Sequence, residues 1–403
     1  MGKELTYALI TPYSLLKSRT GGIISRLLSM SDLELVGARM YTPSDEFVDE
    51  YCKSIEALSI NPMWEKALIE YVNEKLRKNN KLGISNRTML LLLEGEDAVN
   101  VLHNNVIGPI SEHLKSADTI RGTYGDCIKF DDGKIEYFEP AVLTSTDPIV
   151  NIKQLDLFAK YAFSDGGVLE NVIDFGRDKK PETSLVILKP FEKQDPRPGN
   201  IIDVISRLGF SMVGIKLIKM STKQAEEFYR PVKEMFYEKF DEKFRPNLVD
   251  KLKLALNERD LPFVLNDNVM QKLVDQLKEP FITGEFNNIL RYMTGSDTSI
   301  SGDTEGAKKE KKTICFAILY QGINTISKIR ELLGVTDPKK AGRSSIRRFY
   351  GLDILRNAVH ASDSIKNAER ERKIIGLWKD GKSCDVKEII ESYIKESNLA
   401  LKC

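Results

Sequence analysis

The first 41 residues alternate between segments with the composition of strands and one with the spacing of a helix. Residues 5–12 (LTYALITP) are apolar, rich in strand-forming side chains, and end at a proline. Residues 21–30 (GGIISRLLSM) open with two glycines and then place apolar residues at helical intervals, and residues 33–41 (LELVGARMY) again have the composition of a strand. The pattern predicts a strand, a helix and a strand in this order.

The same order returns in the second half of the chain. Residues 184–190 (SLVILKP) and 210–218 (FSMVGIKLI) have the composition of strands, and residues 199–209 (GNIIDVISRLG) have the apolar spacing of a helix. The alignment pairs Thr11 with Lys189, Gly21 with Gly199 and, after one extra residue in the first copy, Val36-Gly37 with Val213-Gly214. An offset of about 178 residues is far too long for a solenoid repeat, so it indicates a duplicated domain.

Later segments of the two copies correspond as well. Residues 88–99 parallel residues 313–324, and TIRGTYG (119–125) parallels SSIRRFYG (344–351). Each copy then reads as strand, helix, strand, helical stretch, strand and late helix. This order predicts an α+β fold, with one α/β sandwich domain per copy.

A charged linker and an insertion complete the predicted organisation. GRDKKPET, at residues 176–183, has the composition of an exposed linker, so we expect domains at 1–178 and 179–403. The second domain carries an extra segment at about 241–312. Its first part, 247–281, has helical apolar periodicity and predicts a helical insertion, whereas its polar, glycine-rich end, 294–312, predicts a mobile loop.

Composition limits the partners. With 60 basic and 59 acidic side chains the formal net charge is +1, so no overall field attracts nucleic acid or an anionic membrane. The five cysteines form no CxxC or Cys/His spacing, which argues against a structural metal site. The longest purely apolar run, Met89 to Leu93, is much shorter than the roughly 20 residues of a membrane helix, and no signal-like start is visible. We expect a cytoplasmic protein.

Four side chains of the second copy suit a polyphosphate. Lys189 ends a predicted strand, Arg330 precedes LLGVTDP, Thr336 lies in that turn, and Arg347 follows it. Guanidinium groups bind phosphate oxygens with paired donors in fixed geometry, an ammonium adds charge, and a hydroxyl adds a donor. Taken singly, such residues are usually surface charges or turn residues. Their joint order favours phosphate binding.

His360, in RNAVHASDS, follows these groups. A lone histidine beside asparagine and serine is more often a turn or capping residue. Within a phosphate-binding cluster, however, a neutral imidazole is a good nucleophile towards phosphorus. Its second nitrogen then needs a partner, and Glu371, eleven residues further along a predicted helix, is suited to that role.

These segments resemble the nucleoside diphosphate kinase family. RNAVHASDSIKNAERE resembles the family's active-site signature of Asn, two apolar residues, His, a small residue and Ser-Asp-Ser. LVILKP resembles its first strand, and LLGVTDPKKAGRSSIR resembles its Leu-Gly-x-Thr-Asn/Asp-Pro to Thr-Ile-Arg segment. The resemblance covers residues 183–240 and 313–378 well, and residues 5–165 more faintly. It implies two ferredoxin-like α/β sandwich domains, the second with the helical insertion.

The resemblance also implies roles for individual residues. His360 corresponds to the family's nucleophile, and Ser362 and Glu371 to the residues that support it. The remaining correspondences are Asn357 with the ribose-contacting asparagine, Arg330, Thr336 and Arg347 with the phosphate-binding groups, Lys189 with the lysine that contacts ribose and phosphate, and Tyr229 with the tyrosine near the nucleophile. The aromatic residue that stacks on the base corresponds to Tyr237, with Phe236 as the alternative.

The implied activity is a nucleoside diphosphate kinase reaction. A nucleoside triphosphate phosphorylates His360, and a nucleoside diphosphate then collects the phosphoryl group, with Mg2+ bridging the phosphates. Three positions depart from the family pattern: Phe191 replaces an aspartate, Arg348 a glycine and Ser345 a threonine. These changes bear on rate and nucleotide preference.

The first copy lacks this chemistry. Thr11 stands at the lysine position, His103 or Asn104 at the first arginine position, Ile110 at the threonine position, Pro140 at the asparagine position and Leu143 at the histidine position. Arg121 alone remains, and we treat His103 and His113 as ordinary helix residues. We expect a non-catalytic domain that pairs with the second copy within the chain, with homo-oligomers also possible. The rival hypothesis is a nucleotide-binding or scaffolding protein without activity.

Overall fold

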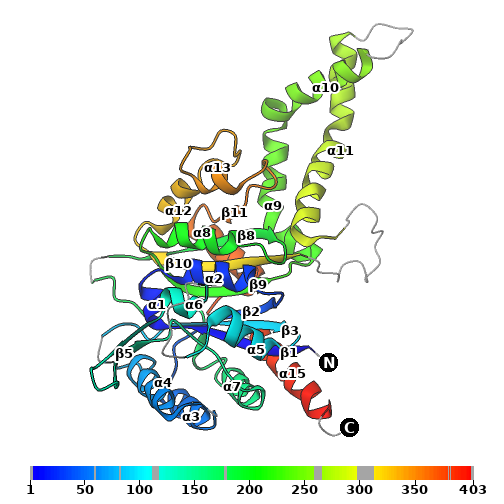
Figure 1. The fold of residues 1–403 in the computed structure, drawn as a ribbon. Helices are drawn as coiled ribbons and strands as arrows, with labels where there is room; N and C mark the ends of the chain where they lie inside the picture. Colours follow the sequence, from blue (N-terminus) through cyan, green and yellow to red (C-terminus); the bar gives the residue numbers. More distant parts are fainter. Residues whose placement is uncertain are drawn as a thin grey trace. The chain divides into compact units, whose positions relative to one another are not determined.

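The computed structural model describes residues 3–58, 60–80, 83–110, 118–176, 179–257, 266–296, 313–379, 381 and 383–400. It divides into two compact units (Figure 1). The first unit combines residues 1–218 with residues 314–403, and the second consists of residues 219–313. His113 and the polar segment 297–312 lie outside the described residues, so the expectations for them stay predictions.

The first copy forms a five-stranded antiparallel sheet in the order β6-β1-β3-β2-β7. Its strands are β1 (Glu4–Ile10), β2 (Glu34–Tyr41), β3 (Thr88–Gly95), β6 (Val142–Leu143) and β7 (Gly166–Gly167). After TIRGTYG the chain forms a separate two-stranded hairpin, β4 (Asp126–Lys129) and β5 (Ile135–Glu139).

The second copy forms a four-stranded antiparallel sheet in the order β11-β8-β10-β9. Its strands are β8 (Glu182–Phe191), β9 (Ser211–Ile218), β10 (Ile314–Gly322) and β11 (Val359–Ala361). In both sheets the first and third strands of the copy lie in the middle, with the second and fourth strands on either side. This is the ferredoxin-like arrangement, and it confirms the α+β fold predicted for both copies.

A shared bulge supports the alignment of the two copies. In the first sheet the pairing of β2 with β3 shifts register between Leu35 and Gly37, and in the second the pairing of β9 with β10 shifts between Leu319 and Tyr320, opposite Gly214 and Met212. The residue left out of the ladder is therefore Val36 in one copy and Val213 in the other. Both valines precede the glycines that the sequence alignment had paired.

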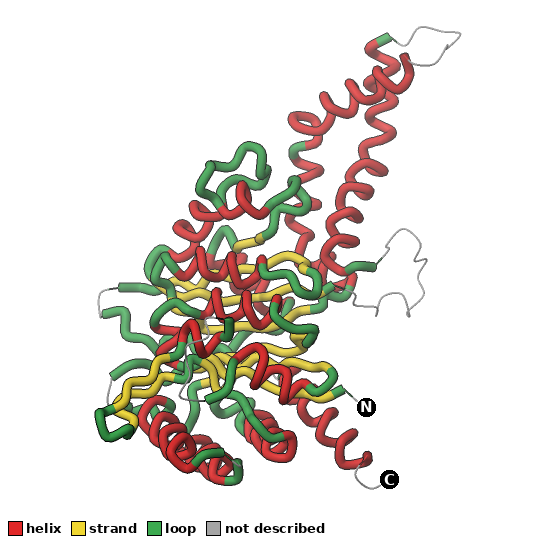
Figure 2. Tube along the Cα trace, in the orientation of Figure 1, coloured by secondary structure: helices red, strands yellow, loops and turns green. Residues whose placement is uncertain are grey.

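One apolar core joins the two sheets of the first unit, whose strands are drawn in yellow in Figure 2. Helices α2 (Thr20–Ser29) and α8 (Arg197–Ser206) contribute their apolar faces to it. A Cβ atom on Gly21 would lie 2.6 Å from the carbonyl oxygen of Gly199, and one on Gly199 would lie 2.2 Å from the amide nitrogen of Ser25. Only glycine permits this approach of two helix backbones. The pair of glycines found in the repeat is thus one point at which the two copies are in close contact.

A second apolar core covers the opposite face of the first sheet. Alternate residues of β1 separate between the two cores, with Ala8 and Ile10 in one and Tyr7 and Leu9 in the other, as the period of a strand buried on both faces requires. The helices that close the second core are α3 (Asp45–Glu56), α4 (Pro62–Lys75), α7 (Pro148–Lys160) and α15 (Asp385–Ala400). The late helix α15 of the second copy therefore packs on the sheet of the first.

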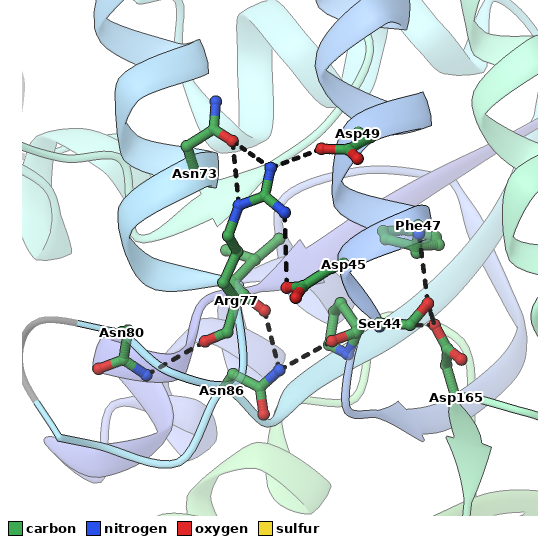
Figure 3. Close-up of polar contacts among 11 residues, drawn as sticks. Ser44, Asp45, Phe47, Asp49, Asn73, Arg77, Asn80, Asn86 and Asp165 are labelled. Carbon is green, nitrogen blue, oxygen red and sulfur yellow. Dashed lines mark hydrogen bonds and ion pairs between the residues drawn. The ribbon is translucent and has the colours of Figure 1, made fainter.

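Polar contacts fix the ends of α3 and α4 (Figure 3). Arg77, just after α4, bonds to Asp49 of α3 at 2.5 Å and to Asn73 of α4 at 2.7 Å. Ser44 caps α3 by accepting from the amide of Phe47, and Asp165 accepts from the Ser44 hydroxyl at 2.8 Å. Side-chain caps of this kind satisfy amides that a helix start leaves open.

The remaining helices of the first unit are short or lie next to the site. They are α1 (Pro12–Leu16), α5 (Ala98–Asn100), the π-helix η1 (Val101–Ile107), α6 (Ile120–Tyr124), α12 (Thr325–Leu333), α13 (Ile346–Tyr350) and α14 (Ile365–Ile374). The predicted cut between residues 178 and 179 falls inside this unit, between the segments that form the two sheets. As a domain boundary it stays a prediction.

The second unit is helical, as the insertion pattern predicts. It contains α9 (Thr222–Glu238), the π-helix η2 (Phe240–Phe244), α10 (Arg245–Asn257) and α11 (Asp267–Thr294). Phe240, Val274 and Ile282 are buried at its centre, where several half-buried aromatic residues pack against them. Among the described residues, no helix combines the length and the apolar character that a membrane crossing requires.

Candidate functional site

Strand β11 brings His360 beside the strand that carries Lys189. His360 pairs with Ile187 of β8, and the amide of Lys189 donates to the carbonyl oxygen of Ala358 at 2.9 Å. Ala358 has a left-handed backbone, with φ of 68°, so the chain turns sharply between Asn357 and the strand. Backbone hydrogen bonds and strand pairing therefore place residue 189 next to residues 357–360, independently of their side chains.

His360 is oriented by a carboxylate on α14. Its Nε2 lies 3.0 Å from Glu371 Oε2, and the same oxygen accepts from the hydroxyl of Ser362 at 2.6 Å. Glu371 is almost completely buried, whereas the His360 side chain is 23% exposed. With Glu371 as acceptor, the ring proton is assigned to Nε2 and the lone pair to Nδ1. With this tautomer, Nδ1 is the ring nitrogen that can act as a nucleophile.

Arg347 braces the backbone around the histidine. Its Nη1 donates to the carbonyl oxygen of Gly334 at 2.7 Å, and its Nη2 donates to that of Val359, the residue before His360, at 3.1 Å. Burial and the nearby charge of Arg330 lower the pKa of Arg347 to about 10. Its buried Nε has no hydrogen-bond partner among the described residues. The same atom of Arg121, the corresponding arginine of the first copy, also has no partner among the described residues.

Next to this arginine, Asn357 is buried and Lys189 is half-buried. The Lys189 ammonium donates to the carbonyl oxygen of Leu355 at 2.9 Å, and burial together with Arg347 lowers its pKa to about 7. Asn357 donates to the carbonyl oxygen of Thr336 at 3.2 Å, while its buried Oδ1 has no partner among the described residues. The site thus concentrates positive charge that burial disfavours, and a bound anion would relieve that cost.

Arg330 and Thr336, which are exposed, complete the predicted set of phosphate-binding residues. Arg330, in the last turn of α12, acts electrostatically on both Arg347 and Asp363. Thr336 lies in the loop after α12 and contributes the carbonyl that binds Asn357. The structure therefore brings together eight predicted residues of the first unit: Lys189, Arg330, Thr336, Arg347, Asn357, His360, Ser362 and Glu371.

Tyr229 and Tyr237 belong to the second unit. Tyr229 is buried on α9 and packs on Phe228, with ring centroids 4.9 Å apart. The Tyr237 hydroxyl donates to Glu279 of α11 at 2.6 Å. Their predicted roles, near the nucleophile and under the base, stay predictions, as does the alternative assignment to Phe236.

The departures from the family pattern have structural effects. Ser345 caps α13 by accepting from the amide of Arg348. The Arg348 guanidinium lies 3.4 Å from the carbonyl oxygen of Pro338 and 3.3 Å from that of Lys339, so it ties α13 to the loop of Thr336. Phe191 stacks on Phe316, with ring centroids 5.3 Å apart.

The turn that holds Lys189 was not predicted. Asp353 accepts from the amides of Leu355 and Arg356 and pairs with the Arg356 side chain, and this turn presents the Leu355 carbonyl to Lys189. The signal in the sequence is Asp353 three residues before Arg356, a spacing suited to a side-chain-capped turn.

Among the described residues, no group of three or more acidic, histidine or cysteine side chains is arranged to hold a metal ion.

The first copy repeats the backbone of the site with other side chains. Leu143 pairs with Leu9 as His360 pairs with Ile187, and the amide of Thr11 donates to Ala141 as that of Lys189 donates to Ala358. Ala141 is also left-handed, with φ of 61°. Leucine thus occupies the position of the histidine in the paired strands.

Arg121 makes the same hydrogen bonds to backbone carbonyls as Arg347 does. It donates to the carbonyl oxygens of Gly108 and Val142, the counterparts of Gly334 and Val359. It is only 1% exposed, and burial lowers its pKa to about 9. Its conserved contacts are with the backbone, so its presence in the first copy is explained without a ligand.

A π-helix resolves the alignment at the first arginine position. The amide of Gly108 donates to His103, five residues earlier, whereas the amide of Gly334 donates to Arg330, four residues earlier. The extra residue of the first copy therefore lies within η1, and His103 rather than Asn104 matches Arg330 by backbone position. Burial and the nearby Arg121 lower the pKa of His103 to about 4, so it is uncharged near neutral pH.

A buried carboxylate fills the space beside Thr11. Glu139 accepts from the Thr11 hydroxyl at 3.0 Å, the Tyr71 hydroxyl at 2.9 Å and the amide of Ala141 at 3.0 Å. Burial raises the pKa of this group. An acidic, fully bonded cluster is unsuited to phosphate. The geometry therefore favours a first copy without a phosphate site.

Comparison with known proteins finds similarity to one family. The family model described as nucleoside diphosphate kinase matches residues 182–246 and 306–377. A nucleoside diphosphate kinase of Desulfitobacterium hafniense is 39% identical over 80 residues, which cover 20% of this chain and 52% of that protein. One of Persephonella marina is 25% identical over 190 residues, which cover 47% of this chain and 89% of that protein.

Among solved structures, the nucleoside diphosphate kinase of Aquifex aeolicus matches 49% of this chain and 95% of its own, with 22% identity and a TM-score of 0.29. The ferredoxin-like fold is assigned from the strand order of the two sheets and not from this match. The matched segment spans about half the length of the Desulfitobacterium relative. Both segments that the family model matches lie in the second copy.

Proposed function

We propose that the protein is a nucleoside diphosphate kinase with one working site, in the second copy. The observation that carries this proposal is the contact of His360 Nε2 with Glu371 Oε2 at 3.0 Å, beside the half-buried Lys189 and Arg347. A histidine fixed by a carboxylate at one nitrogen, with cationic groups next to it, is suited to nucleophilic attack on a phosphate.

The reaction proceeds in two half-reactions. The lone pair of His360 Nδ1 attacks the γ-phosphorus of a nucleoside triphosphate, and the bond between that phosphorus and the bridging oxygen breaks as the diphosphate leaves. Glu371 stabilises the positive charge that develops on the ring. A second nucleoside diphosphate then attacks the phosphohistidine, and the neutral imidazole is restored.

The cationic side chains bind and orient the phosphates. Lys189, Arg330 and Arg347 supply charge, and the Thr336 hydroxyl adds a donor at the exposed side. This donor set fits phosphate oxygens and not a metal ion, so Mg2+ would be bound through the phosphates of the nucleotide. When bound there, Mg2+ would offset the charge of the phosphates and polarise them.

The nucleoside end of the substrate would be held by Asn357 and by the aromatic platform that Tyr237, or alternatively Phe236, is proposed to supply. Stacking grips a base by its flat face and needs no hydrogen-bond code. We therefore propose broad acceptance of purine and pyrimidine nucleotides. The first copy acts as an intrachain partner for the second, and further homo-oligomers and a cytoplasmic location stay predictions.

An exchange assay tests the proposal. Purified protein is mixed with Mg2+, γ-labelled ATP and GDP, and labelled GTP is measured. We expect transfer by the wild-type protein and loss of transfer in His360→Ala, with an unchanged circular dichroism spectrum. Full exchange by that variant would refute the proposal.

A second candidate, a nucleotide-binding protein without turnover, draws support from the first copy, where Leu143 and Glu139 occupy the site. The two functions differ in one result. The second predicts that magnesium ATP binds to the wild-type protein and that no phosphoprotein forms.

A further inference from the structure

A bridging segment, residues 166–171, leads from the first sheet to the second. At its start, Gly167 pairs with Met40 as part of β7 at the edge of the first sheet. Two residues later, the amide of Leu169 donates to the carbonyl oxygen of Val213 in β9, the edge strand of the second sheet, at 2.7 Å. The segment therefore belongs to the first copy by sequence and contacts the second by hydrogen bonding.

Polar side chains anchor both ends of the bridging segment. Before it, Asp165 binds the amide and the hydroxyl of Ser44, each at 2.8 Å (Figure 3). At its end, the amide of Asn171 donates to Gln321 Oε1 of β10 at 3.0 Å. Asn171 has φ of 63°, a conformation that asparagine tolerates better than most residues. The position of Glu170, between these anchors, is thereby fixed.

Glu170 forms a two-pronged ion pair with Arg372 of α14. Arg372 Nη1 lies 2.8 Å from Glu170 Oε1, and Nη2 lies 3.0 Å from Oε2. The side chains are 9% and 17% exposed for the arginine and the glutamate. Paired guanidinium–carboxylate bonds fix relative orientation, and removal of one partner leaves a largely buried charge. This pair therefore constrains geometry much more than a surface pair does.

Arg372 controls the end of α14. Its Nε donates to the carbonyl oxygen of Leu377, and the amide of Leu377 donates back to the Arg372 carbonyl at 2.9 Å, across the left-handed Gly376. Glu371, which holds His360 and Ser362, is the preceding residue in the same turn of the helix. The orientation of that turn sets where the Glu371 carboxylate lies relative to the imidazole ring.

From these contacts we infer that Glu170, a residue of the non-catalytic copy, is a positioning residue for His360, acting through Arg372 and the last turn of α14. The inference rests on the proposed phosphorylation of His360. It gives the first copy a role in the chemistry beyond packing, because the ion pair transmits the placement of the bridging segment to Glu371.

The test is the single-turnover rate of His360 phosphorylation in the full chain with saturating magnesium ATP. We expect Glu170→Gln to slow this step about 10-fold, the usual size of an effect on a group that orients a reacting residue, while the Kd for ATP changes less than about twofold. The matched control is Glu50→Gln, which removes a first-copy carboxylate that bonds to Lys160 and Tyr161. The control should react at the wild-type rate.

Two further variants separate positioning from general loss of stability. If Glu170 acts through Arg372, the double variant Glu170→Gln/Arg372→Gln is no slower than the slower single variant. The reason is that each single substitution already removes the same ion pair. The double variant contains no unpaired buried charge, so it also serves if Glu170→Gln does not fold. A wild-type rate in Glu170→Gln or in the double variant, or multiplied effects of about 100-fold in the double variant, overturns the inference. Absence of phosphohistidine in the wild-type protein refutes the proposed function instead.

Discussion

The two copies of the sandwich present different side chains on matching backbone. Leu143 and Thr11 in the first copy stand where His360 and Lys189 stand in the second, and both copies place a left-handed alanine beside them. Both copies also have an arginine at the second position of a short helix, Arg121 in α6 and Arg347 in α13. In both copies this arginine donates to two backbone carbonyls, whereas the histidine, the lysine and the buried asparagine of the proposed site are present in the second copy alone.

The largest expected effect concerns the shared arginine. Arg121→Ala should lower the free energy of unfolding by about 3–5 kcal/mol, because it removes a buried side chain and leaves the carbonyls of Gly108 and Val142 without their donor. Exchange activity per folded molecule should stay near the wild-type value. Arg347→Ala should reduce both stability and activity.

Denaturant unfolding and exchange assays on the two variants check this pair. Equal loss of activity per folded molecule in both variants would contradict a purely structural role for Arg121.

The next largest effect distinguishes the roles of the two buried glutamates, Glu371 and Glu139. Glu371→Gln should slow phosphorylation about 10- to 100-fold, because the amide keeps the shape of the side chain and loses the charge that stabilises the ring. Glu139→Gln in the first copy should leave the rate unchanged. Rapid-quench measurement of the phosphoenzyme gives both rates, and a rate loss in Glu139→Gln would show that the first copy takes part in catalysis directly.

A smaller effect follows from the lowered pKa of the half-buried Lys189. The pKa of Lys189 is lowered to about 7 in the folded protein, from 10.5. The unfolded chain therefore binds more protons between these values, so the free energy of unfolding should rise with pH above 7 and fall back as pH drops towards 7. Between pH 7 and pH 9 the gain should be on the order of 2 kcal/mol.

Lys189→Thr, which installs the residue of the first copy, should remove this part of the pH dependence. Denaturant titrations of both proteins at several pH values provide the check. An identical slope in the two proteins would mean that Lys189 stays charged at neutral pH.

The smallest expected effect is in Leu143→His. The new histidine would stand in the strand position of His360, but with Thr11 and the buried Glu139 beside it in place of the cationic groups. We expect no phosphorylation at residue 143 and an exchange rate within about twofold of the wild-type rate. Label at residue 143, found by peptide mapping, would show that backbone position alone is sufficient.

Much of the fold could be predicted from the sequence because strand and helix periods are local properties. The paired glycines Gly21 and Gly199 were visible as matching positions, but their role as a helix contact between copies depends on the packing of the two sheets. The crossing of α15 to the first sheet was not predicted either. Its apolar face indicates burial but does not say against which partner.

The site was predictable to a similar degree. His360, Glu371 and the cationic residues followed from residue type and order, whereas the main-chain contacts of Arg347 and the pKa of Lys189 depend on burial and on carbonyl positions set by tertiary structure. The choice between His103 and Asn104 needed the observed π-helix, because a one-residue insertion leaves no unambiguous signal in the sequence. Glu170 and Arg372 were not predicted because they are 202 residues apart.

The central claim is that chemistry resides in the second copy alone, and phosphosite mapping tests it most directly. The wild-type protein is incubated with magnesium and γ-labelled ATP, quenched in alkali and digested, and the labelled peptides are identified before and after addition of GDP. The account predicts acid-labile label on His360 alone, discharged by GDP. Label on His103, or a stable label elsewhere with none on His360, would contradict it.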